Sequence, residues 1–529
     1  MKTSQWFIAA AVAAALAGCG ADEISSAGSN GNITINPPPA NPNPNPNPGG
    51  EDPTGVTPAA NCPSVVASNE LPLRDDGTIT GPTGTYRVCA LPNSIDRSVN
   101  LPRTAGVLYA LDGRVNVGAD QGAVPTATAP VVMTIQPGVV LFAKTGTSWL
   151  AVNRGNRINA VGTAQLPIVF TSRENVEGTA TDDSHGEWGG VVLMGRAPVT
   201  DCTVAPGAPP GSVTCERQTE GAVDQAYYGG ITANDDSGTL RYVQIRYSGY
   251  VLSNNNELQA LTLEGVGSGT TIDHVQMHNS SDDGFENFGG RVKMRHLVVT
   301  GADDDSIDLD VGYKGTLQYV IAVQKSSGTS GDSIIELDSA GTTEDQAPRT
   351  HMKLANFTFV HRNMGTANLA SLLFRGKADA TLVNGVISSP IACLRYNGAN
   401  ILTTDAPTDK LGPPAFRSVV MQCAAGAQFA GSGGLTALQV ANAFNDASNT
   451  NVNYAFTTSL TNVFINGANE TAVTATDPKT LDAAFDTTNY VGAVRDANDT
   501  WYAGWTCNSA TASFGSTSSA CTSLPSLAD

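Results

Sequence analysis

Two segments of the chain match each other when one is slid along the other by 22 residues. They are residues 274–288 (HVQMHNSSDDGFENF) and 296–310 (HLVVTGADDDSIDLD). The superposed pairs are His274 and His296, Asp282 and Asp304, Asp283 and Asp305, Phe285 and Ile307, and Glu286 and Asp308. Residues of one kind therefore recur at a fixed period, which is the signature of a stacked repeat. We expect an all-β solenoid, a right-handed single-stranded parallel β-helix.

A short strand pattern recurs along the middle of the chain and supports this fold. Successive strands begin at Tyr242, His274, His296, Tyr319, Asn356 and Asn384, at intervals of 32, 22, 23, 37 and 28 residues. The shortest intervals fit bare coils, and we expect the excess length of the others to project as loops, where binding sites usually lie. Residues 201–237, which carry Tyr227 and Tyr228, are one such insertion.

The N-terminus predicts export and lipidation. Lys2 precedes an apolar run from Trp6 to Leu16, which is too short to span a bilayer and is typical of a secretion signal. The run ends in Leu-Ala-Gly-Cys at residues 16–19, which resembles the lipobox of bacterial lipoproteins. That resemblance implies cleavage after residue 18 and acylation of Cys19, so the lipid bilayer is an expected partner. Gly20, where an aspartate would resemble an inner-membrane retention signal, favours an outer-membrane or cell-surface location.

The composition divides the chain into regions. After the signal peptide (1–18), residues 19–60 hold the lipidated cysteine and Asn-Pro repeats that cannot bury a core, so we expect a disordered tether. We expect an N-terminal cap region over 61–130, the β-helix body over 131–425 and an irregular C-terminal β region over 426–529. A solenoid accommodates this length because each coil contacts only its neighbours.

The cysteines agree with an exported protein. Without Cys19, eight of the nine remain, and they fall into pairs that are close in sequence. The expected disulfides are Cys62 with Cys89, Cys202 with Cys215, Cys393 with Cys423, and Cys507 with Cys521. Distant coils of a solenoid cannot meet, which favours these local pairs. The chain has no Cys-x-x-Cys pair accompanied by histidines, which disfavours a metal-binding role for the cysteines.

The charge narrows the class of partner. The formal net charge is −19, although only 15% of the residues are charged. An acidic surface of this kind disfavours nucleic acid and anionic membrane surfaces as partners. Cations, basic surfaces and neutral sugars remain compatible with it.

Several motifs occur in an order that resembles a known family. They are I-x-P-G at 135–138, R-I-x-A-x-G-T at 157–163, P-I-V-F-T-S at 167–172 and W-G-G at 188–190. This order is similar to that of bacterial β-helix cell-surface lipoproteins over residues 130–400. Trp501-x-x-x-Trp505-Thr506 resembles the C-terminal end of the same family. The resemblance implies the fold and assigns no catalytic residue.

The stacked carboxylates predict an acidic ridge. In residues 306–310, the two-residue period of a strand sends Ile307 and Leu309 into the core and Asp308 and Asp310 to solvent. Neighbouring coils lie about 4.8 Å apart, so Asp283 is expected over Asp305, with Asp332 next. Calcium is a candidate cofactor because it takes six to eight oxygen ligands. The candidate ligands are Asp282, Asp283, Glu286, Asp304, Asp305 and Asp308.

A second interpretation of these aspartates needs no metal. Aspartates in turns commonly accept hydrogen bonds from backbone amides and stay solvated. The sequence has no ordered D-x-D-x-D-G calcium loop that would decide between the two interpretations.

An enzyme of β-helix type would use the same ridge. Paired carboxylates on such a face resemble those of polysaccharide lyases and glycoside hydrolases. Ala302-Asp303-Asp304-Asp305 loosely resembles the Gly-Asp-Asp motif of polygalacturonases, but the Asn-Thr-Asp and Gly-His-Gly motifs are missing. A basic residue beside the acidic turns would favour a lyase. The candidates are Lys293, Arg295, Lys314 and Lys325.

Histidines and aromatic residues give weaker signals. His274 and His296 are expected to stack on one face, and packing is favoured over metal ligation because the sequence shows no third ligand nearby. An outward-facing aromatic platform could bind sugar, although such residues more often fill core stacks. Its candidates are Trp188, Tyr247, Tyr250, Phe288 and Tyr313.

Together these patterns predict a surface-exposed lipoprotein whose β-helix body binds an extracellular polymer or surface protein, with calcium ordering the ridge. A polysaccharide lyase or glycoside hydrolase is the alternative, and a structural surface spacer is the third.

Overall fold

The computed structural model of the 529-residue chain describes residues 55–66, 71–253, 256–327, 330–339, 344–365 and 369–525. The expected signal peptide, Cys19 and the tether up to residue 54 lie outside the described residues. Residues 55–60 were expected in the tether, but Val56 already bridges Gly84 in the first coil. Among the described residues, no helix has the length and apolar character needed to cross a membrane.

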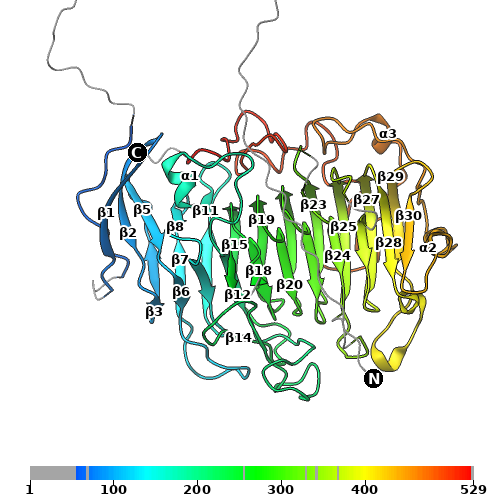
Figure 1. The fold of residues 1–529 in the computed structure, drawn as a ribbon, viewed down its shortest axis with the longest axis horizontal. Coiled ribbons are helices and arrows are strands. Elements are labelled where there is room, and N and C mark those ends of the chain that lie inside the picture. Colours follow the sequence, from blue (N-terminus) through cyan, green and yellow to red (C-terminus); the bar gives the residue numbers. More distant parts are fainter. Residues whose placement is uncertain are drawn as a thin grey trace, which may run out of the picture. The chain divides into compact units, whose positions relative to one another are not determined.

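Two long sheets wind together into a right-handed parallel β-helix, as predicted (Figure 1). In sheet A the order is β1 (Arg74–Gly81), β2 (Gly84–Ala90), β5 (Val107–Leu111), β8 (Val140–Ala143), β11 (Ile168–Ser172), β15 (Gly238–Arg246), β19 (Thr271–His278), β21 (Lys293–Thr300), β23 (Thr316–Val323), β25 (His351–Val360), β27 (Asp379–Ser388) and β29 (Ala415–Gln422). Three further strands belong to this sheet. Strand β10 (Arg157–Val161) pairs with β15 and with β7 (Val132–Ile135), and β7 pairs with β4 (Val99–Leu101).

Sheet B receives one strand from each coil. Its order is β3 (Ser94–Ile95), β6 (Arg114–Val117), β9 (Trp149–Val152), β12 (Gly190–Met194), β18 (Leu261–Glu264), β20 (Phe285–Phe288), β22 (Ile307–Asp310), β24 (Ile335–Leu337), β26 (Ala370–Phe374), β28 (Ala392–Asn397) and β30 (Phe429–Ser432). Parallel pairing already joins β2 to β5, so the solenoid begins earlier than the expected boundary at residue 131. After β30 come two short helices, α2 (Ala437–Phe444) and α3 (Ala468–Thr471).

The 22-residue repeat sets the register between neighbouring coils. Phe285 pairs with Ile307 and Glu286 with Asp308 across β20 and β22, as the superposition predicted. Ile307 and Leu309 are completely buried, which confirms the predicted alternation for the aliphatic pair. Apolar side chains of the two sheets form one continuous core, because each coil places its aliphatic residues over those of the coil before.

Each long strand of sheet A bends at one residue with a positive φ. The seven residues are Tyr242 (53°), His274 (58°), His296 (51°), Tyr319 (60°), Asn356 (52°), Asn384 (55°) and Ser418 (53°). The first six are the strand starts that the sequence pattern identified. The left-handed conformation is costly for most residues, and asparagine tolerates it best after glycine. The bend recurs at the same position in successive coils, so these residues form a line along which sheet A bends.

The insertion 201–237 covers part of the outer face of sheet B. It contains the predicted Cys202–Cys215 disulfide and a short hairpin, β13 (Arg217–Gln218) and β14 (Tyr227–Tyr228). The buried Tyr228 packs with Trp149, Met194 and Phe288 of sheet B. The insertion therefore packs against the outer face of sheet B as far as Val311, directly after β22. A second hairpin, β16 (Val251–Ser253) with β17 (Asn256–Glu257), follows it.

The C-terminal segment returns along the outer face of sheet A, beside strands far earlier in the chain (Figure 1). Trp505 and Phe514 pack against outward-facing Val298 and Ile321. Gln276 Nε2 donates to Cys507 O (3.1 Å), and Cys507 N donates to Gln276 Oε1 (2.7 Å). Buried Arg246 donates to Cys521 O (2.7 Å) near helix α1 (Arg173–Glu177). The C-terminal segment therefore supplies hydrogen-bond partners for polar side chains of sheet A, and buried polar groups need such partners.

All four predicted disulfides are present. The Cα–Cα distances are 5.6 Å for Cys62–Cys89, 4.8 Å for Cys202–Cys215, 5.6 Å for Cys393–Cys423 and 4.8 Å for Cys507–Cys521. The last pair lies in the returning C-terminal segment. Each bridge closes a short local loop, as a solenoid demands.

Candidate functional site

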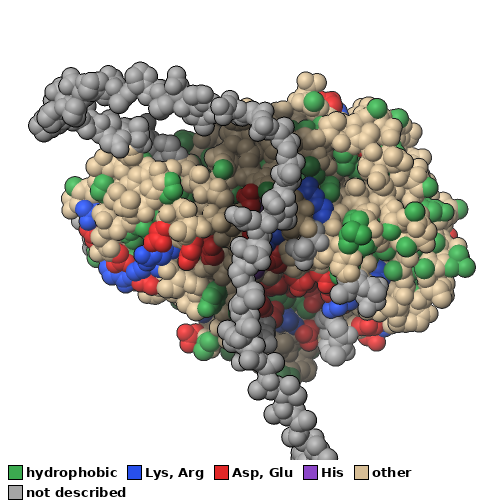
Figure 2. All heavy atoms as spheres, turned by 45° about the horizontal axis from the view of Figure 1, so that its top comes forward, with side chains coloured by type: hydrophobic (Ala, Val, Ile, Leu, Met, Phe, Trp, Pro, Cys, Tyr) green, Lys and Arg blue, Asp and Glu red, His purple; other side chains and the backbone are tan. Residues whose placement is uncertain are grey.

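The outer face of sheet B carries a column of carboxylates over successive coils. Glu286 of β20, Asp308 of β22 and Glu336 of β24 share one register position. The two-residue period points them away from the core, while their neighbours fill it. Figure 2 shows acidic side chains, with lysine and arginine among them, in a band across the middle of the face in view. We call the outer face of β20, β22 and β24 the acidic face.

A second column of aspartates lies in the turns that lead into these strands. Asp305 N donates to Asp283 Oδ1 (3.0 Å), and Ser333 N donates to Asp305 Oδ1 (2.6 Å). Each aspartate therefore caps a backbone amide of the next coil through one carboxylate oxygen, as the metal-free interpretation expected, but both are 5% exposed rather than solvated. Ser333, rather than Asp332, follows Asp305 in this column.

The position expected for Asp332 was wrong by one residue. Asp332 N donates to Asp304 O (2.8 Å), so Asp332 stacks on Asp304. The 28-residue coil between β22 and β24 is longer than the 22-residue repeat, and its extra residues are in the turn. In the next coil, Asp304 is thus followed by an aspartate, whereas Asp305 is followed by a serine.

Five of the six predicted ligands meet in two adjoining triads. The carboxylate oxygens of Asp282, Asp283 and Asp304 lie within 4.8 Å of one another, as do those of Asp283, Glu286 and Asp308. Asp283 belongs to both triads. The sixth predicted ligand, Asp305, belongs to neither triad, and its Oδ1 accepts the N–H of Ser333.

The carboxylates of the acidic face are less solvated than the sequence predicted. Asp308 and Asp310 were expected to point into solvent, but both are only half-exposed, and Glu286 retains 6% of its exposure. Burial, followed by repulsion from neighbouring carboxylates, raises the pKa of Asp283, Glu286 and Asp308 well above the usual range. The same causes raise the pKa of Asp282 to about 7. The insertion 201–237 packs on the outer face of sheet B and contributes to this lower exposure. A strand pattern does not reveal where such an insertion packs.

One carboxylate oxygen of the two triads is both buried and without a hydrogen-bond donor among the described residues. Asp308 Oδ1 is buried and accepts no hydrogen bond from the described residues. A buried carboxylate oxygen without a donor costs free energy unless a proton or a cation satisfies it. An all-oxygen donor set with this unsatisfied atom fits a hard cation such as calcium.

The raised pKa values predict how the calcium-free fold responds to pH. The carboxyls titrate near 4 in the unfolded chain, whereas Asp282 and Glu336 titrate at about 7 in the fold. Between these values the folded state binds more protons at these two carboxyls, so the stability that they contribute is fully present below about pH 4 and is lost as the pH rises toward 7. Urea unfolding in a chelator should show a lower midpoint at pH 7.5 than at pH 5. A midpoint that rises over this range would contradict the assignment.

Basic groups border the acidic face at two places. Arg375, which follows β26, places Nη2 2.9 Å from Glu336 Oε1 and Nε 2.7 Å from Asp338 Oδ2. Arg375 and Asp338 also line a cavity of about 470 Å³ together with Glu344, Asn397 and Asn400. Arg375 was not among the basic residues expected from the sequence, because the unequal coil lengths hide its position beside Glu336.

Of the four basic residues that the sequence offered, Lys325 lies beside the acidic turns. Its Nζ is 2.7 Å from Asp303 Oδ1, directly before Asp304. Arg295 pairs with Asp486 (2.8 Å) and Lys314 pairs with Asp409, both away from the triads. Lys293 lies exposed at the start of β21 in sheet A.

The aromatic candidates do not form an exposed platform. Trp188, Tyr247 and Tyr313 are completely buried and Phe288 retains 6% exposure, so they fill core and wall contacts. Tyr250 keeps 37% of its surface exposed. His274 and His296 stack with ring centres 4.2 Å apart, as predicted.

Comparison with known proteins agrees with this architecture. The sequence profile described as "Pectate-lyase like beta helix domain" matches residues 105–411, more than half of the chain. No curated protein and no solved structure matches the chain. The parallel coils and the profile match together show that the chain belongs to the family of pectate-lyase-like β-helix domains.

Proposed function

We propose that the acidic face binds calcium and, through it, an extracellular polymer. The observation that carries this proposal is the pair of carboxylate triads that share Asp283 and include the unpartnered oxygen of Asp308. Oxygen ligands at this density suit a cation that takes six to eight of them. The calcium would be held by Asp282, Asp283, Glu286, Asp304 and Asp308, and it would replace the protons that the cluster otherwise holds.

The polymer that fits best carries hydroxyl and carboxylate groups. The apo face is acidic and would repel a polyanion, whereas bound cations would bridge the two. Arg375 beside Glu336 adds a fixed positive charge at one end, next to the polar cavity of about 470 Å³. Two guanidinium nitrogens of Arg375 already pair with Glu336 and Asp338, and its remaining N–H groups can donate to a carboxylate of the polymer. An acidic polysaccharide therefore matches both the cation site and the arginine.

The proposed location follows from the N-terminus of the sequence. The Leu-Ala-Gly-Cys motif supports acylation at Cys19, and the Pro- and Asn-rich residues after it support a tether. We place the β-helix body on the cell surface or outer membrane as a lipid-anchored binding or adhesion module. Mass spectrometry of the mature N-terminus should find an acylated Cys19, and a free, uncleaved Met1 would contradict the proposed lipid anchor.

The binding experiment uses the full chain and an acidic polysaccharide immobilised on beads. Retention is expected with calcium and should be lost with a chelator, because the bridging cation is removed. Asp283→Asn should abolish the calcium-dependent retention. Asp183→Asn, which removes the same charge at an exposed position outside the triads, should leave it unchanged. Equal retention of all proteins with and without calcium would refute the bridging role.

A second candidate function is cleavage of the same polymer, and Arg375 is the observation that favours it. A positive charge next to stacked carboxylates and calcium could stabilise the negative charge that develops during β-elimination. The unsaturated product of a lyase absorbs ultraviolet light, so its appearance during incubation with the polymer would indicate turnover. Arg375→Gln should then remove activity and leave calcium binding intact. A structural spacer is the interpretation that survives if neither binding nor turnover occurs.

A further inference from the structure

A second cluster of metal-ligating groups lies on sheet A, apart from the acidic face of sheet B. It surrounds the bend that all long strands of sheet A share, where His274 and His296 adopt a positive φ. The two imidazoles stack with ring centres 4.2 Å apart. Tyr319 continues the stack beside His296 at 4.7 Å. The repeated backbone conformation holds both imidazoles in one place on neighbouring coils.

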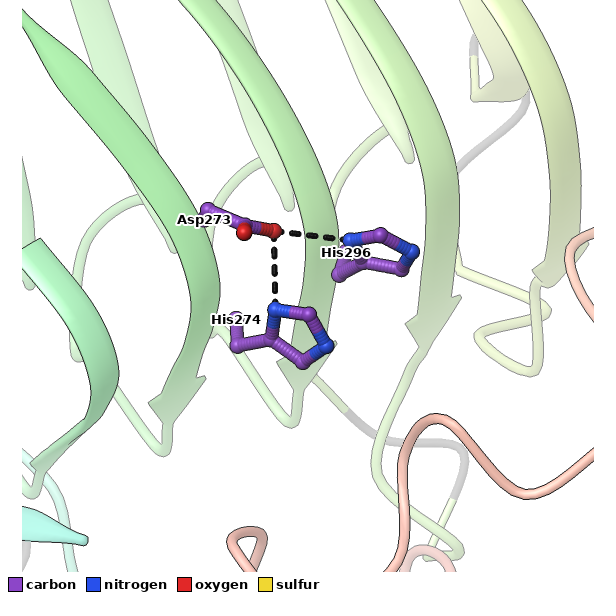
Figure 3. Close-up of side chains that lie close together, drawn as sticks. All are labelled: Asp273, His274 and His296. Carbon is purple, nitrogen blue, oxygen red and sulfur yellow. Dashed lines mark hydrogen bonds and ion pairs between the residues drawn. The ribbon is translucent and has the colours of Figure 1, made fainter. Parts of the chain in front are cut away.

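A carboxylate completes this cluster. Asp273, which precedes His274 in β19, places Oδ1 2.8 Å from His274 Nδ1 and 2.7 Å from His296 Nδ1 (Figure 3). Its other oxygen lies 3.5 Å from Arg241 Nε. Metal ligation was disfavoured from the sequence because no third ligand was evident near the two histidines. The structure supplies that ligand from the adjacent residue.

The nitrogen of His274 is not satisfied by this contact. His274 retains 8% exposure, and its Nδ1 approaches Asp273 Oδ1 without the alignment of a hydrogen bond. His296 Nδ1 makes a true hydrogen bond to the same oxygen. A buried imidazole nitrogen that is aimed at a shared carboxylate, but has no hydrogen-bond partner among the described residues, is an atom that a cation could satisfy.

We propose that Asp273, His274 and His296 form a binding site for a divalent transition-metal ion, with Zn²⁺ the expected occupant. Two imidazoles and one carboxylate are a donor set typical of such ions, whereas the all-oxygen acidic face suits calcium. The ligand atoms need to separate slightly to admit an ion about 2 Å from each. Asp273 and His296 each keep about a fifth of their side-chain surface exposed, at 21% and 20%, which leaves a path for the ion. Arg241 would orient the ligating carboxylate.

The site joins two coils to the C-terminal segment. Trp501 lies 5.0 Å from the His296 ring, and Trp505 lies 5.4 Å from the His274 ring. A bound ion would therefore fix β19 to β21 directly beneath the segment that covers sheet A. Zn²⁺ is expected to raise the thermal unfolding temperature of the full chain.

The test combines calorimetry with Zn²⁺ and electron paramagnetic resonance with Cu²⁺ on the full chain. His274→Asn and His296→Asn are the chosen variants, because Asn356 and Asn384 occupy the same left-handed corner in β25 and β27. Either variant should weaken Zn²⁺ binding by at least about 100-fold, since even second-sphere changes cost 10–100-fold. His185→Asn, at an exposed imidazole outside the cluster, should bind as the unaltered chain does.

The Cu²⁺ spectrum of the unaltered chain needs no variant and counts the nitrogen ligands. Coupling to two imidazole nitrogens supports the site. A spectrum with oxygen ligands alone would overturn the proposal, as would Zn²⁺ binding that persists in both histidine variants or the absence of Zn²⁺ binding. Because the two carboxylate triads contain no imidazole, failure of this test leaves the calcium proposal standing.

Discussion

Replacing Asp283 with Asn is expected to stabilise the calcium-free chain at pH 8 and to abolish its stabilisation by calcium. Asn keeps the oxygen that accepts the N–H of Asp305, so the amide cap survives. The substitution removes the charge common to both triads. Relief of repulsion should raise the free energy of unfolding by on the order of 1 kcal/mol. Calcium at 100 times its dissociation constant should add about 2.7 kcal/mol to the unaltered chain and nothing to the variant.

Urea unfolding with and without calcium measures both effects. Asp183→Asn is the matched control, because it is exposed and lies outside the triads. It should change neither the calcium-free stability nor the response to calcium. A calcium-free variant that is less stable than the unaltered chain would show that the charge of Asp283 stabilises the fold, which contradicts its assignment as a repelled ligand.

Replacing Trp505 with Ala is expected to detach the C-terminal segment from sheet A. Trp505 is completely buried and packs against the rings of Tyr242 and His274. Truncation of a buried tryptophan typically costs about 3–5 kcal/mol. The loss should concentrate in the segment and the strands beneath it, since each coil of a solenoid depends mainly on its neighbours.

Hydrogen exchange should therefore accelerate at Cys507, whose amide bonds to Gln276, more than at the core strands of sheet B. Leu438→Ala, at a side chain that is 69% exposed on α2, provides the control and should change stability by less than about 0.5 kcal/mol. Unchanged exchange at Cys507 in the Trp505 variant would mean that the segment is held by its polar contacts alone.

The sequence predicted the coils where their lengths are regular. The 22-residue offset gave the register of Glu286 over Asp308, because a parallel ladder repeats the same face at each coil. It misplaced Asp332, since the next coil adds residues in its turn. The sequence did not indicate Arg375 for the same reason. The coil that separates Glu336 from Arg375 is longer than the 22-residue repeat, so the offset does not bring the two residues together.

The sequence pattern could not predict contacts between segments that are far apart in the chain. Gln276 and Cys507 are 231 residues apart, and nothing local to either marks their pairing. The metal-ligating role that we infer for Asp273 was hidden in a similar way. Strand alternation assigns it and His274 to opposite faces, but the positive φ of His274 brings both toward His296. The burial of the carboxylates depends on walls that come from other parts of the chain.

The measurement that tests the calcium site most directly is a calorimetric titration of the full chain with calcium at about pH 7, in two buffers of different ionisation enthalpy. Because burial and neighbouring carboxylates raise the pKa of Asp282 to about 7 and raise the pKa of Asp283 and Glu286 well above the usual range, calcium must displace protons from the cluster. We expect saturable binding with an apparent heat that differs between the buffers through proton release. No saturable heat, or binding without proton release, would contradict the assignment of the acidic face as a calcium site.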